Sequence, residues 1–227
     1  MTTTRIACVV PALNAGPTIG GVISRIRATL PASFIVVVDD GSSDDTYMTA
    51  RAAADATVWF ARNRGKGAAL RAGFGVALEH GADIVVTLDA DGQHDPGFAP
   101  ALIRALGDAE LAIGARDRRS GQMPAGRRLT NRLSAAAVAR CIGRPVADAQ
   151  SGFRAIVSQV LADVKPRGDR YEFETEFLIV AALRGHRLAF VPVPTTYSAV
   201  VPSQFRAVRD SARIVSTLWR FGMGAPR

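Results

Sequence analysis

The sequence predicts an α/β protein built on a mostly parallel sheet that is covered by helices on both faces. Three observations lead to this fold class. Short runs of β-branched residues alternate with segments of helical character through the first half of the chain. Residues that favour the starts and ends of helices separate these segments. Polar and acidic side chains gather directly after three of the runs, which is typical of the ligand-binding edge of an open parallel sheet.

The elements follow in order along the chain. Runs at 6–10, 34–38, 57–60 and 84–88 predict strands, with helices between them. Pro17 lies where the first helix should begin, Ser42 or Ser43 can cap the second, and Gly81 ends the third. We expect further strands at 111–113 and 188–193, and a helix at 173–183. The segment 203–221 predicts a C-terminal amphipathic helix, which divides the chain into a main domain, 1–202, and a helix with its tail, 203–227.

Composition narrows the classes of function. The chain has 227 residues, enough for one domain with a substantial core. Two cysteines and three scattered histidines indicate neither a disulfide framework nor a zinc site. We find no signal peptide and no apolar stretch of the roughly 20 residues that a transmembrane helix needs. A net charge of +8 favours an anionic partner, which is a nucleic acid, an anionic lipid surface or a phosphorylated substrate.

The strongest chemical motif follows the run at 84–88. Asp89 and Asp91 are separated by one small residue, and Gln93 can add a neutral oxygen. Such oxygen ligands suit Mg²⁺ or Mn²⁺, with the remaining positions filled by substrate phosphates and water. The cation would act as a Lewis acid toward a departing diphosphate. The alternative is an acidic turn that caps the helix beginning near Pro96, and Asp95 fits that role.

Two further groups lie at predicted element ends. Asp39 and Asp40 follow the run at 34–38, where a carboxylate can accept hydrogen bonds from a nucleobase or a ribose; a turn capped by serine is the alternative. Lys66 lies between two glycines at the start of a helix, so it can present an ammonium and backbone N–H groups to an anion. A purely structural helix start is the alternative there, because the Walker pattern is absent.

Seven motifs in this order resemble the family 2 glycosyltransferases of the GT-A fold, and most closely their dolichyl- or polyprenyl-phosphate mannosyl- and glucosyltransferases. The motifs occupy 10–14, 38–44, 65–73, 88–96, 114–116, 151–154 and 171–176. The resemblance implies a Rossmann-like GT-A fold. It also implies an inverting transfer of a hexose from a nucleoside diphosphate sugar, of the GDP-mannose or UDP-glucose type, to a polyprenyl phosphate of the dolichyl or undecaprenyl type.

The resemblance also implies roles for individual residues. The donor nucleotide would be bound by Pro11, Asn14, Asp39, Asp40, Lys66 and Asp89. Mg²⁺ or Mn²⁺ would be held by Asp89, Asp91 and Gln93. The acceptor phosphate would be bound by Arg127, Arg128, Asn131 and Arg132, in a segment 116–132 that holds six arginines. The residues expected to act in catalysis are Asp91, Arg116, Arg127 and Arg128. One departure is that 193–202 contains no basic residue, although the lipid-phosphate relatives often carry an arginine there.

The acceptor decides the mechanism. A lipid phosphate is already anionic and can attack without a general base, so arginines and the cation suffice. A hydroxyl acceptor would need a carboxylate to take its proton, and the candidates are Asp148, Glu174 and Glu176. A glycosyltransferase of the same fold acting on a glycan or small-molecule hydroxyl is therefore the first alternative.

A non-catalytic basic module that binds nucleic acid is the second alternative. It is disfavoured because the arginines lack interleaved aromatics and the acidic clusters would repel a phosphate backbone, so we expect no nucleic-acid partner. The final helix can bind an anionic membrane surface, a membrane partner subunit or the core. We expect a cytoplasmic protein that is peripheral at the inner face of the membrane.

Overall fold

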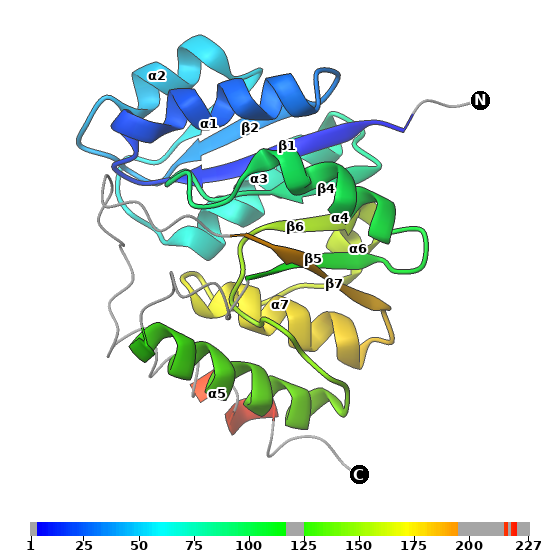
Figure 1. The fold of residues 1–227 in the computed structure, drawn as a ribbon. Helices are drawn as coiled ribbons and strands as arrows, with labels where there is room; N and C mark the ends of the chain where they lie inside the picture. Colours follow the sequence, from blue (N-terminus) through cyan, green and yellow to red (C-terminus); the bar gives the residue numbers. More distant parts are fainter. Residues whose placement is uncertain (1–3, 117–124, 195–215, 218, 222–227) are drawn as a thin grey trace.

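Seven strands form one sheet in the order β3-β2-β1-β4-β6-β5-β7 (Figure 1). This computed structural model describes residues 4–116, 125–194, 216–217 and 219–221, with the backbone alone at 125–127. Six strands run parallel, and β6 is antiparallel to both of its neighbours, β4 and β5. The strands are β1 (Ile6–Ala12), β2 (Phe34–Asp39), β3 (Ala56–Trp59), β4 (Ile84–Thr87), β5 (Leu111–Arg116), β6 (Arg154–Val157) and β7 (Leu188–Val193).

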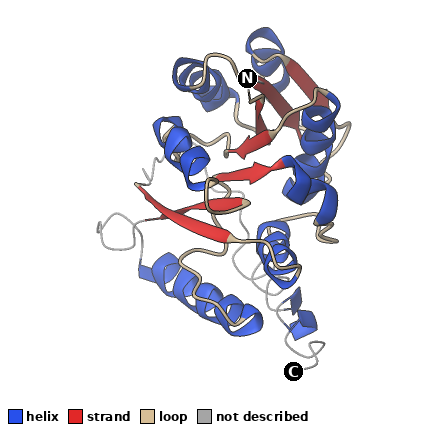
Figure 2. Cartoon of the chain, turned by 90° about the vertical axis from the view of Figure 1, so that its right-hand side faces the viewer, coloured by secondary structure: helices blue, strands red, loops and turns tan. Residues whose placement is uncertain are grey.

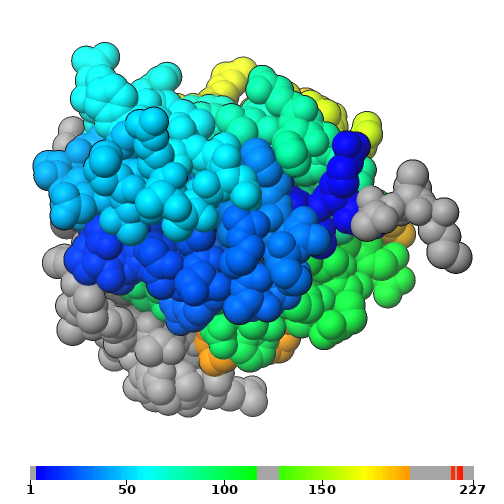
Figure 3. All heavy atoms as spheres, turned by 90° about the horizontal axis from the view of Figure 1, so that it is seen from above, coloured from blue at the N-terminus to red at the C-terminus, as the bar shows by residue number. Residues whose placement is uncertain are grey.

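Helices cover both faces of this sheet, as the view turned by 90° also shows (Figure 2). They are α1 (Gly16–Thr29), α2 (Thr46–Ala53), α3 (Lys66–Glu79), α4 (Ala99–Ala105), α5 (Ala125–Ile142), α6 (Ser158–Asp163) and α7 (Glu172–Leu183), with a 3-10 turn at Pro96–Phe98 before α4. Seen from above, the surface that faces the viewer is formed mainly by the early part of the chain, which includes α1 and α2 and is blue and cyan in Figure 3.

Alternation along the strands produces two apolar cores. In β1, Val9 faces the core under α3 and α7, whereas Val10 faces the core under α1 and α4. Because both faces are covered, the strands read as nearly continuous apolar runs rather than as alternating ones. Phe74 of α3 and Phe177 of α7 pack in the first core, with ring centroids 6.4 Å apart.

The predicted fold class is confirmed, and so are the six predicted strands to within a few residues. Pro17 does lie in the first turn of α1, and Gly81, with φ +78°, directly follows the end of α3. Strand β6 was not predicted. The proposed serine cap of the second helix was wrong, because α2 begins at Thr46 after Asp45, and the Ser42 hydroxyl bonds to Asn14 and Asp39 instead.

The predicted C-terminal helix, 203–221, lies largely outside the described residues. Of its described part, Phe221 packs against the core under α3 and α7, and Arg220 Nη2 lies 3.2 Å from Glu176 Oε1 of α7. This part of the segment therefore packs on the main domain. Within the described ranges, no helix combines the length and the apolar character that crossing a bilayer requires.

Candidate active site at the carboxyl edge of the sheet

The loops after β1 and β2 are bonded to each other. Asn14 has φ +50°, a left-handed conformation that asparagine tolerates better than most residues. Its backbone N–H donates to Ser42 Oγ at 2.9 Å, and its side-chain Oδ1 accepts from the Ser43 N–H at 2.9 Å. Pro11 is buried in β1, opposite Val38 of β2. These bonds fix the shape of the edge where the two strands end.

Asp39, at the end of β2, is fully buried and offers one oxygen to the site. Its Oδ1 accepts from the Ser42 N–H at 3.0 Å and from the Ser42 hydroxyl at 2.5 Å. Its Oδ2 accepts no hydrogen bond from any described residue, and buried carboxylate oxygens of that kind are rare in folded proteins. The position and the open oxygen suit an acceptor for a nucleotide N–H or hydroxyl.

Asp40 holds the start of α3. Its two oxygens accept from the backbone N–H groups of Arg64, at 2.6 Å, and Gly65, at 2.8 Å. Burial raises the pKa of the Asp40 carboxyl, and the two amides partly oppose that rise. Asp40 thus positions the residue that follows, Lys66. Its expected direct contact with the donor stays a prediction.

Lys66 joins two carboxylates that are far apart in the sequence. Its Nζ lies 2.5 Å from Asp89 Oδ1, after β4, and 2.5 Å from Glu174 Oε1, on α7. Burial disfavours the charged ammonium, but the two carboxylates outweigh burial and raise the pKa of Lys66. Lys66 therefore carries a positive charge at neutral pH.

The two carboxylates respond differently to this environment. Burial disfavours ionised Asp89, but Lys66 outweighs it and lowers the pKa of that carboxyl. At Glu174 burial dominates and raises the pKa, although Lys66 opposes the rise. The triplet is packed tightly, because a Cβ at Gly152 would lie 2.7 Å from Asp89 Oδ1 and 2.8 Å from Lys66 Nζ.

Asp91 and Gln93 share one turn after β4. The Gln93 backbone N–H donates to Asp91 Oδ1 at 3.0 Å, and both residues are partly exposed. The predicted metal ligands Asp89, Asp91 and Gln93 therefore lie at one strand end. No group of three or more His, Cys, Asp or Glu side chains arranged to hold a metal occurs in the part of the chain that the structure describes. Two carboxylates with a neutral oxygen fit a cation that takes its other ligands from substrate phosphates.

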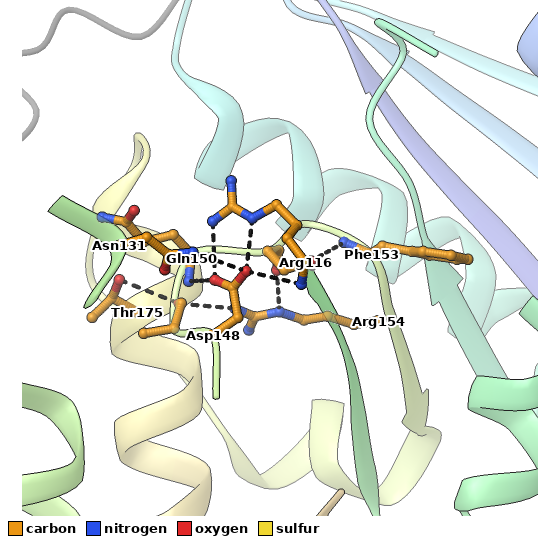
Figure 4. Close-up of polar contacts among 9 residues, drawn as sticks. Arg116, Asn131, Asp148, Gln150, Phe153, Arg154 and Thr175 are labelled. Atoms are coloured by element: carbon orange, nitrogen blue, oxygen red, sulfur yellow. Dashed lines mark hydrogen bonds and ion pairs between the residues drawn. The ribbon is translucent and has the colours of Figure 1, made fainter. Parts of the chain in front are cut away.

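A charged pair lies at the end of β5 (Figure 4), near enough to Asp89 for Arg116 to favour the ionised form of that carboxyl. The fully buried Asp148 binds Arg116 through two hydrogen bonds, Nε to Oδ2 at 2.7 Å and Nη2 to Oδ1 at 3.0 Å. Asn131 of α5 also donates its side-chain N–H to Asp148 Oδ2, at 3.4 Å. Burial disfavours the Asp148 carboxylate, but Arg116 outweighs it and lowers its pKa. Asp148 thus orients Arg116 and connects it to α5.

The other predicted acceptor residues lie on the same helix. Arg128 and Arg132 are exposed on α5, and the side chain of Arg127 lies outside the described residues. Glu176, the third candidate general base, accepts from the Gly168 N–H at 2.9 Å in addition to its ion pair with Arg220.

Two buried polar residues received no role from the sequence. Arg154 of β6 is buried and donates to the carbonyl oxygens of Ser151, at 2.8 Å, and Ala149, at 3.4 Å (Figure 4). Burial lowers its pKa, which Glu174 opposes. His94 is buried against Phe153, and burial lowers its pKa to about 4, so its ring is neutral at pH 7. An arginine within an apolar strand is the sequence signal that could have drawn attention to Arg154.

Comparisons with known proteins identify the family of the chain. Residues 7–164 match the family described as Glycosyl transferase family 2. The undecaprenyl-phosphate mannosyltransferase of Micrococcus luteus is 31% identical over 83% of this chain and 82% of its own, and the polyprenol monophosphomannose synthase of Mycolicibacterium smegmatis is 32% identical over 86% and 78%.

Among solved structures, a similar fold occurs in glucosyl-3-phosphoglycerate synthase from Mycobacterium tuberculosis, in complex with Mg²⁺ and uridine diphosphate. It is 26% identical, with a TM-score of 0.79 over 99% of this chain and 81% of that one. The family match spans well over half of the chain, and it includes the strands and loops that carry Asp39, Lys66 and Asp89. The chain is therefore a glycosyltransferase that belongs to glycosyl transferase family 2.

Proposed function

We propose that the protein transfers a hexose, with inversion, from a nucleoside diphosphate sugar to a polyprenyl phosphate at the cytoplasmic face of a membrane. Support for this acceptor comes from the relatives of Micrococcus and Mycolicibacterium, whose names state a polyprenyl or undecaprenyl phosphate product or acceptor. The donor-side geometry supports the nucleoside diphosphate sugar, because the open oxygen of Asp39 and the charged Lys66–Asp89 pair both lie at the carboxyl edge of the sheet.

The burial and ion pairing of three carboxylates favour a phosphate acceptor over a hydroxyl acceptor. Asp148, Glu174 and Glu176 are the candidate general bases for a hydroxyl acceptor, and all three are buried. Each is also bound to a basic side chain, which is Arg116, Lys66 and Arg220 respectively. A carboxylate held in this way is poorly placed to receive a proton from an incoming hydroxyl. A phosphate acceptor needs no such base, because it is already anionic.

Particular residues would divide the work. Asp39, Asn14 and Pro11 would line the nucleotide pocket. Asp89, Asp91 and Gln93 would hold Mg²⁺ or Mn²⁺, which would supply charge neutralisation at the leaving diphosphate. Arg116, oriented by Asp148, would bind phosphate oxygens or the transferred group, and the arginines at the start of α5 would receive the acceptor phosphate.

The test is a transfer assay with labelled GDP-mannose and UDP-glucose, Mn²⁺ or Mg²⁺, and a short-chain polyprenyl phosphate. We expect a lipid-linked sugar with one of these donors. Donor binding without any lipid-linked product would refute the acceptor assignment. In the same assay, Arg128→Gln should lower turnover by about tenfold or more, whereas Arg51→Gln, an exposed arginine on α2, should leave turnover unchanged.

A second candidate is transfer to the hydroxyl of a small phosphorylated molecule. It is favoured by the similarity of fold to glucosyl-3-phosphoglycerate synthase over nearly the whole chain. The same assay with 3-phosphoglycerate in place of the lipid separates the two candidates. Product with this acceptor, and none with polyprenyl phosphate, would establish the second candidate.

A further inference from the structure

The outward face of α5 carries two leucines. The helix turns Asn131, Ser134, Ala135 and Val138 inward, and all four are buried. On the opposite side, Leu129 is 59% exposed and Leu133 is 61% exposed. Residues four apart lie on successive turns of one helix face, so these two leucines form a continuous apolar strip. Large apolar side chains gathered on an exposed face mark an interaction surface.

The charge around this strip identifies the kind of partner. The sequence of α5 contains four arginines and no acidic residue. Arg128 and Arg132, each next to one of the leucines in sequence, are exposed. Arg140, exposed as well, lies seven residues after Leu133 and so continues the same face. Leucines flanked by arginines on one helix face complement an anionic bilayer surface, where apolar side chains enter the acyl boundary and arginines meet lipid phosphates.

The exposed face of α5 lies close to the active site, so a membrane bound there would be close to the site as well. Asn131, between the two leucines in sequence, points the other way and donates to Asp148, the partner of Arg116. The outward face of α5 is therefore separated from the charged pair by the width of one helix, about 10 Å. The described part of the C-terminal segment lies at the same end of the molecule as α5 in Figures 1 and 2, and its Trp219 is 66% exposed.

We propose that α5 docks the protein on an anionic bilayer through Leu129 and Leu133, so that the active site lies at the level of the lipid phosphate groups. The functional importance of this docking rests on the proposed polyprenyl phosphate acceptor. The docking itself is a separate physical property, and it can be measured without any turnover.

The binding experiment uses the full chain and vesicles of phosphatidylcholine, with and without phosphatidylglycerol, in a flotation assay. Leu129→Gln/Leu133→Gln is compared with Met48→Gln, because Met48 is 65% exposed on α2 at the other end of the molecule. The wild type and Met48→Gln should bind the anionic vesicles, more weakly as salt rises. The double variant should bind at least about tenfold more weakly, and Arg140→Gln about fivefold more weakly.

A turnover experiment separates docking from the acceptor assignment. The double variant should keep wild-type turnover on a water-soluble short-chain polyprenyl phosphate and lose it on undecaprenyl phosphate held in anionic vesicles. If the wild type uses neither acceptor, the proposed function fails, while the flotation result still decides the docking.

Three results would overturn the docking. The first is unchanged vesicle binding by the double variant. The second is a fall in its Tm of more than a few degrees, which would mean that the leucines pack against the protein's own chain. The third is a change in its oligomeric state, which would mean that they pack against a second copy.

Discussion

Gly152 offers the sharpest test of the active-site geometry. It lies in the loop before β6, and its carbonyl oxygen accepts from the Thr87 hydroxyl at 2.6 Å, which holds the loop against β4. In Gly152→Ala the new Cβ would lie 2.7 Å from Asp89 Oδ1, 3.0 Å from Asp89 Oδ2 and 2.8 Å from Lys66 Nζ. Ordinary van der Waals contact begins at 3.4 Å, so the Asp89–Lys66 pair must move by roughly 0.7 Å.

This displacement should reduce activity far more than stability. A misplacement of about 1 Å in a catalytic group can lower the rate about 100-fold, so we expect kcat/KM of Gly152→Ala to fall by about 30- to 100-fold. The Tm should change by only a few degrees, because the side chains that move are partly exposed. Transfer of labelled sugar measures kcat/KM, and calorimetry measures the Tm. In addition, a Mn²⁺ titration followed by electron paramagnetic resonance should show weaker Mn²⁺ binding by the variant.

Gly75→Ala is the matched control. Gly75 lies on the exposed side of α3, and a Cβ there would meet nothing within 4 Å. This change should raise stability by about 0.5–1 kcal/mol and leave turnover unaltered. Turnover of Gly152→Ala within threefold of wild type would refute the idea that Asp89 and Lys66 act from fixed positions.

Three further substitutions test other contacts. Asp148→Asn should destabilise the protein by about 3 kcal/mol at pH 7, because it removes the buried charge that binds Arg116. Folding lowers the pKa of Asp148, so its contribution to the free energy of unfolding is complete above its unfolded pKa of about 3.9. That contribution is lost as the pH falls through the lower pKa of the folded state. The Tm values of variant and wild type should therefore converge in acid. Asp40→Asn should cost about 1.5–3 kcal/mol in urea unfolding, because both backbone amides lose a charged acceptor and one of them then faces an NH2 donor. Glu174→Gln should lower turnover on a phosphate acceptor by about tenfold or less while Lys66 retains Asp89, whereas a loss of about 100-fold or more would identify Glu174 as a general base.

Much of the fold could be predicted because its signals are local. Each parallel strand is a short apolar run, and the acidic residues after β2 and β4 follow directly from the position of the strand ends. Strand β6 escaped prediction because it begins with a buried arginine, which shortens its apolar run to three residues. Its antiparallel direction depends on pairing with β4 and β5, and the sequence of one short segment does not indicate with which strands it pairs.

The site was predictable in its position and only partly in its contacts. Asp39, Asp89 and Asp91 lie where the sequence placed them, at one edge of the sheet. The bonds of Asp40 to two backbone amides follow from the approach of the loop before α3, which no residue pattern encodes. The pairing of Lys66 with Glu174 likewise depends on how α7 packs across the sheet.

β6 is late in the chain but central in the sheet, and this affects how the protein folds during synthesis. β4 is completed early, but its second neighbour, β6, is synthesised only after α4, β5 and α5. Until then one edge of β4 has no partner, and the apolar side chains beside it, Val85 and Val86, lack part of their cover. Chains that end before 154 should therefore aggregate rather than fold into a free nucleotide-binding half. The strand that runs against the others thus makes the two halves of the enzyme a single folding unit.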